Sequence, residues 1–178
     1  MTETMTWDQA AAIAQKASIA PVSRRSDGLP FLFQSANAVG ILVHRGAIVT
    51  ARGPAVAGAY LRDLGIIDGA GPGLDDVLHL LYVLDALPHV EGIGGEGYIH
   101  VPNDARLAEL TARLEADGRE ARVVVHYFLD GPGTESLSGE QLASMVPPRP
   151  VARLVLTIPR DGDASWSRSD VAWRDPAE

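Results

Sequence analysis

The chain has no cysteine and only one lysine among its 178 residues. The lack of cysteine excludes disulfides, thiolate catalysis and the cysteine-ligated zinc and iron–sulfur sites. It is also typical of a reducing compartment, so we expect a cytoplasmic protein. Because Lys16 is the single lysine, arginine supplies nearly all of the positive charge. We interpret this bias as the signature of a GC-rich bacterial genome and not as a sign of guanidinium chemistry.

Long apolar runs are also lacking. None approaches the roughly 20 residues needed to cross a bilayer, and residues 1–7 lack the basic region and apolar core of a secretory signal. Positive charge is scarce as well, since 23 acidic residues outnumber 15 basic ones and give a net charge of −8. An acidic chain does not favour the phosphate backbone. We therefore expect no membrane partner and no nucleic-acid partner.

The size and composition are those of one globular domain. A chain of 178 residues with 46% hydrophobic and 21% charged residues is long enough to close a core. We expect a single α+β domain over residues 1–160. Residues 161–178 would be either a final edge strand or a tail that docks on this domain.

The first half of the chain predicts a helix, a strand, a hairpin and a second helix. Thr6 and Gln9 have the spacing of a capping box before an alanine-rich helix. Residues 18–30 are expected to be a loop, with a turn at Asp27-Gly28, and residues 31–33 a short strand. Residues 39–51 predict a β-hairpin because two apolar runs flank a short connection that contains Gly46. Gly53-Pro54 then begins a helix that Gly65 ends.

Residues 74–87 predict a further helix, largely buried and ended by Pro88. Its polar stripe is Asp75, His79 and Tyr82, at i, i+4 and i+7. Asp75 and His79 at this spacing can begin a metal site, which is one reading of the chain. The set of ligands is incomplete, however, so we interpret the stripe as solvated and predict no metal. Three glycines at 69, 71 and 73 precede the helix, but nearby carboxylates repel phosphate, and no cofactor is predicted.

Residues 97–129 predict a βαβ unit. Residues 97–101 and 122–129 read as strands, and between them Asn103 begins an amphipathic helix that Asp117-Gly118 ends. Strands and helices interleave along the whole chain. This order predicts an α+β fold with a mixed β-sheet and with helices packed mainly on one face.

The alternation of side chains along the two predicted strands indicates a candidate site in this unit. Val123 and Val125 would face the helix, which leaves the other face to Tyr98, His100, Arg122 and His126. His100, His126 and Tyr98 are the candidate catalytic residues, since a histidine can act as a general base near neutral pH. The simpler interpretation is a solvated sheet face, and the sequence does not say whether the two strands are neighbours.

The C-terminal segment carries Trp166 and Trp173. Because an exposed tryptophan is unfavourable unless it packs, we expect this segment to contact its own domain or another subunit. Together with Arg122, these two residues are the candidate binding residues. The sequence contains no cofactor loop and no complete catalytic signature. We therefore expect a non-enzymatic module that binds or regulates a protein partner or self-associates as a homodimer. The alternative is a small hydrolase or transferase that uses His100 and His126.

Overall fold

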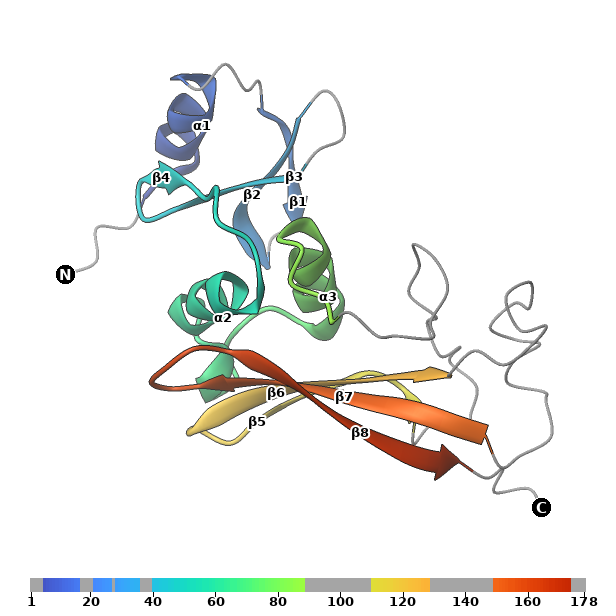
Figure 1. The fold of residues 1–178 in the computed structure, drawn as a ribbon. Coiled ribbons are helices and arrows are strands. Elements are labelled where there is room, and N and C mark those ends of the chain that lie inside the picture. The colour runs from blue at the N-terminus through green and yellow to red at the C-terminus, as the bar shows by residue number, and fades with distance from the viewer. Residues whose placement is uncertain are drawn as a thin grey trace.

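The computed structural model describes residues 5–16, 21–26, 28–35, 40–88, 110–128 and 149–173. These residues form an α+β fold of three α-helices, one 3₁₀ turn and two four-stranded sheets, which confirms the predicted class. Figure 1 shows helices α2 and α3 between the two sheets. All strand pairs are antiparallel. The described strands thus make two antiparallel sheets in place of the single mixed sheet that the sequence predicted.

The first sheet contains four strands in chain order, β1 (Pro21–Ser26), β2 (Leu29–Ser35), β3 (Gly40–His44) and β4 (Ala47–Ile48). The predicted loop over residues 18–30 is wrong, because β1 pairs with β2 through a turn at Gly28. β1 has the sequence PVSRRS, which lacks the apolar alternation that would reveal a strand. Its place in the sheet is decided by pairing with the apolar strand β2.

Helix α1 (Trp7–Lys16) covers one face of this sheet. The predicted capping box is confirmed, since the Thr6 amide donates to Gln9 Oε1 at 2.7 Å and the Gln9 amide donates to Thr6 Oγ1 at 3.3 Å. Ala10 is buried together with Phe33 and Val43 from the sheet. The small alanine side chain lets the helix approach the strands closely.

The predicted hairpin over residues 39–51 is confirmed as β3 and β4. His44 pairs with Ala47, so the connection is the two-residue turn Arg45-Gly46. Both turn residues have positive φ, 51° at Arg45 and 77° at Gly46. This is the geometry of a type I′ turn, whose twist matches that of the strands it joins.

Two helices follow and form the central layer. As predicted, α2 (Pro54–Asp63) begins at the proline and the chain leaves the helix at Gly65, which is left-handed. A 3₁₀ turn, η1 (Ile66–Asp68), leads to α3 (Leu74–Val83). The predicted helix over 74–87 is four residues too long. The chain turns at Asp85, which has a φ of 49°, and this turn keeps Leu84 and Ala86 buried.

The second sheet has the order β5 (Arg113–Ala116), β6 (Glu120–Phe128), β7 (Arg149–Pro159) and β8 (Ser165–Trp173). The predicted βαβ unit is corrected here, because residues 113–116 form a strand and not the end of a helix. Asp117 Oδ1 accepts from the amides of Arg119 and Glu120 and so stabilises the turn between β5 and β6. An Asp-Gly pair suits a hairpin turn as well as a helix end, and pairing with β6 decides between them. Residues 97–109 lie outside the described part of the chain.

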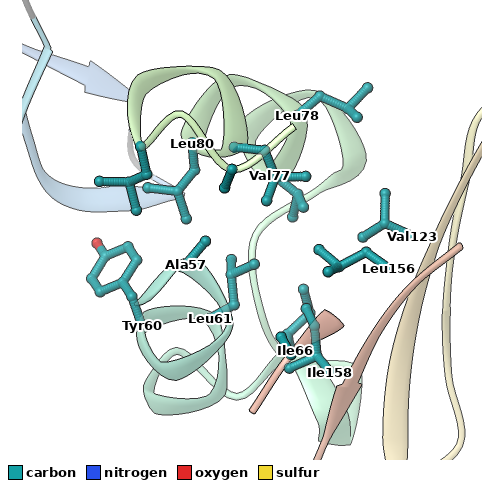
Figure 2. Close-up of a cluster of buried hydrophobic side chains, with 14 of the residues drawn as sticks. Ala57, Tyr60, Leu61, Ile66, Val77, Leu78, Leu80, Val123, Leu156 and Ile158 are labelled. Carbon is teal, nitrogen blue, oxygen red and sulfur yellow. The ribbon is translucent and has the colours of Figure 1, made fainter. Parts of the chain in front are cut away.

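The main core joins the helical layer to both sheets. Figure 2 shows Leu61 of α2 and Val77 of α3 close to Val123 of β6 and Leu156 of β7. On the side of the first sheet, Leu32 and Leu42 form a cross-strand pair in the same core. Each fully buried leucine of this kind contributes about 2 kcal/mol through burial of apolar surface. This continuous core is what fixes the two sheets relative to each other.

Helix α2 lies very close to the second sheet at one point. A Cβ atom at Gly58 would overlap the Cβ of Ala164, just before β8. Arg62 of the same helix donates to the Pro159 carbonyl at 3.0 Å and to the Gly162 carbonyl. These contacts hold the β7–β8 turn against α2. No helix in the described part of the chain is long and apolar enough to cross a membrane.

Candidate functional site

The predicted alternation of β6 is confirmed for the described residues. Val123 and Val125 lie in the main core, and Arg122, Val124 and His126 lie on the other face of the sheet. We call this the outer face, because α2 and α3 cover the opposite one. Tyr98 and His100 lie outside the described residues. The proposed pairing of His100 with His126, and an enzyme built on it, therefore stay predictions.

His126 is buried on the outer face, with only 6% of its surface exposed. It pairs across the strands with Arg153 of β7, and its Nδ1 has no hydrogen-bond partner among the residues that the structure describes. The pKa of His126 is lowered from 6.5 to about 4, mainly by burial and also by the positive charges of Arg153 and Arg113, and a hydrogen bond with the Leu110 backbone offsets part of this lowering. The imidazole is therefore neutral at pH 7. This differs from a solvated face, on which a histidine would titrate near its ordinary pKa.

Arg122 lies farther along the same face of β6 and is half exposed. It forms an ion pair with Glu120 two residues before it. An exposed pair of this kind contributes little to stability, about 0–1 kcal/mol. Its guanidinium is thus held near the β5–β6 turn and remains accessible to solvent.

The polar stripe of α3 is only partly solvated. Tyr82 is 64% exposed and Asp75 is exposed, whereas His79 is half-buried. No group of three or more histidine, aspartate or glutamate side chains in the described ranges is arranged to hold a metal ion.

Trp166 packs against the protein's own core. Its indole N–H donates to the Ala86 carbonyl at 2.7 Å, and its ring packs against the main core. Trp173 is the last residue of β8, and its backbone pairs with that of Arg149. Partner binding by Arg122, Trp166 and Trp173 stays a prediction.

Strand β8 forms an edge of the second sheet. Its nine residues pair with β7 in an uninterrupted antiparallel register, from Thr157 opposite Ser165 to Arg149 opposite Trp173. β7 is its only strand neighbour within the described residues. Ser165 and the run from Ser167 to Asp170 are exposed, so this edge faces solvent.

A second candidate site lies on the first sheet, where sequence reasoning placed only a turn. Asp63, at the end of α2, accepts from His44 Nε2 at 2.7 Å, from Arg45 Nε at 2.9 Å and from Arg45 Nη2 at 3.0 Å. The His44 ring also meets Tyr60 edge-on, with ring centroids 5.0 Å apart. Burial raises the pKa of Tyr60 to about 12, so its phenol stays protonated.

His44, Arg45 and Asp63 stand at one end of a groove of about 930 Å³ between α1, the β3–β4 turn and the end of α2. Apolar side chains line much of the rest of it, namely Met5, Ala12, Ile13 and Phe31, and Gln9 and Lys16 line it as well. The sequence analysis missed this site because His44 and Asp63 are distant in the chain. Its one local signal is arginine at the first position of a type I′ turn, where asparagine, aspartate or glycine is usual.

Comparison of the chain with protein-family models, with curated proteins and with solved structures gave no match. The function is therefore argued from the geometry of these surfaces.

Proposed function

We propose that this protein is a non-enzymatic module that binds protein through the exposed edge of β8, and that its partner is a second copy of the same chain. The observation that carries the proposal is the long, regular and exposed edge of β8. Edge strands present unpaired backbone N–H and C=O groups that can pair with another strand. Addition of a strand at such an edge is a common mode of protein recognition.

The edge lacks the features that usually prevent strand addition. Proteins protect their edges with proline, with bulges or with very short strands. β8 contains no proline, pairs with β7 without a bulge and is nine residues long. Within the described residues, charge is the feature that protects this edge, from Arg168 and Asp170, which bond to each other at 2.8 Å.

The order of these two charges favours self-pairing. Two β8 strands that pair antiparallel about a two-fold axis at Ser169 place Arg168 of each copy opposite Asp170 of the other. A symmetric dimer therefore gains two cross-strand pairs of opposite charge, each worth about 0.2–1 kcal/mol. A two-fold interface of this kind is the commonest form of self-association.

Charge exchange at these positions tests the proposal. Arg168→Asp or Asp170→Arg alone would place like charges opposite each other in the dimer and should weaken it about tenfold. The double variant Arg168→Asp/Asp170→Arg restores opposite charges and should return the dimer close to wild-type strength. Sedimentation equilibrium over a range of protein concentrations measures these constants.

Arg119→Asp is the matched control for Arg168→Asp, because it makes the same change in net charge in the exposed β5–β6 turn, away from the edge. It should leave the dimer constant unchanged. A wild-type chain that stays monomeric at every concentration would overturn the proposal. A dimer that is insensitive to both single variants would overturn it as well, because the contact would then lie elsewhere.

A further inference from the structure

The groove between α1 and the β3–β4 turn has the size and the lining of a small-molecule site. Its volume of about 930 Å³ lies within the range of ligand pockets, roughly 300–1,000 Å³. Such pockets are mainly apolar with a few convergent polar groups. Here Met5, Ile13 and Phe31 supply apolar surface, and His44 and Arg45 supply the polar groups.

The polar end is held in one geometry. Arg45 has a φ of 51°, a left-handed conformation that is unfavourable for a residue with a side chain. Asp63 binds two of its guanidinium nitrogens and also the His44 ring. A strained residue persists where its surroundings fix it, and such residues gather at ligand sites.

The net charge of the described residues that line the groove is positive. Lys16, the single lysine of the chain, lines the same groove as Arg45, and Asp63 is the one carboxylate among the described lining residues. Asp63 occupies Nε and Nη2 of Arg45, which leaves Nη1 for another acceptor. The Arg45 side chain is 70% exposed and is therefore accessible. On a chain of net charge −8, this is a local excess of positive charge, which attracts anions.

We propose that the groove binds a small amphipathic anion, an apolar chain or ring that carries a carboxylate. The apolar body would lie over Met5, Ile13 and Phe31, and the carboxylate would lie between Arg45 and Lys16. Charge complementarity selects this ligand class over a neutral apolar one. The site lies on the first sheet and does not involve β8, so it goes beyond the proposed self-association.

Titration calorimetry with decanoate tests the site. Decanoate should bind, and decanol, which lacks the charge, should bind at least roughly tenfold more weakly. Arg45→Gly should weaken decanoate binding by a similar factor. Glycine adopts positive φ without strain, so this variant keeps the turn and should melt at the same temperature as the wild type or higher.

Arg119→Gly is the matched control, since it removes an exposed arginine from a different turn. It should leave decanoate binding unchanged. Lys16→Gln provides a second test and should also weaken decanoate binding. No binding of decanoate to the wild-type chain would overturn the proposal, and so would equal affinity of the wild type and Arg45→Gly.

Discussion

The indole nitrogen of Trp166 lies 2.7 Å from the carbonyl oxygen of Ala86, to which it donates a hydrogen bond. This bond joins the C-terminal strand to the turn after α3, 80 positions earlier in the chain. Ala86 is buried and Trp166 is half-buried, so the bond is only partly accessible to solvent. The C-terminal strand is thereby tied to the helical layer as well as to β7.

Trp166→Phe should lower the free energy of unfolding by about 1–3 kcal/mol. Phenylalanine keeps most of the apolar contact but leaves the buried Ala86 carbonyl without its donor. Urea denaturation at pH 7 measures the change. Ser167→Ala, at the neighbouring exposed position, should alter stability by less than about 0.5 kcal/mol. Equal stability of wild type and Trp166→Phe would show that the bond does not hold β8 in place.

Gly58→Ala should destabilise the protein although alanine favours helices. The gain in helix propensity is about 1 kcal/mol. The new Cβ would overlap Ala164, and separating α2 from the second sheet costs about 1–3 kcal/mol. Thermal unfolding would show a lower Tm. The second substitution Ala164→Gly removes the opposing Cβ and should recover part of the loss. A higher Tm for Gly58→Ala alone would contradict this close packing.

Acid should weaken the fold through His126. Its pKa is 6.5 in the unfolded chain and about 4 in the folded one. As the pH falls from 6.5 to 4, the unfolded chain therefore takes up a proton that the folded chain does not, and stability is lost. The variant His126→Gln should therefore lose about 2 kcal/mol less unfolding free energy than the wild type over this pH range.

The measurement compares urea unfolding of the wild type and His126→Gln at pH 7 and at pH 4.5. The difference between the two proteins isolates this ring, because the carboxylates titrate in both. The variant should gain stability relative to the wild type at the lower pH. A constant difference between the two pH values would mean that His126 is protonated as readily in the folded chain as in the unfolded one.

Thr6→Ala should fray the first turn of α1. It removes the hydroxyl that accepts from the Gln9 amide, and loss of such a cap costs about 1 kcal/mol. Hydrogen exchange at the first amides of α1 should become faster, and exchange in β6 and β7 should not change. Thr50→Ala, an exposed threonine outside any helix, is the control. Unchanged exchange in α1 would show that the cap contributes nothing.

Features that depend on neighbouring residues could be predicted from the sequence. The capping box at Thr6, the Gly53-Pro54 start of α2 and the alternation of β6 all depend on residues close together in the chain. Each of these features is satisfied by neighbouring backbone and side-chain atoms, so its pattern is visible without the fold. The class of the protein followed from the order of such segments.

Where the local sequence pattern fits more than one structure, contacts with distant segments decided which structure forms. Asp117-Gly118 fits a helix end and a hairpin turn equally, and contact with β6 selected the hairpin. The polar strand β1 carries no apolar alternation and is defined by its neighbour β2. His44 and Asp63 meet only because α2 ends beside the β3–β4 turn. The sequence by itself thus determined the cap of α1, the start of α2, the hairpin and the faces of β6. The tertiary structure alone decided strand partners and the groove, because these depend on atoms that are distant in the chain.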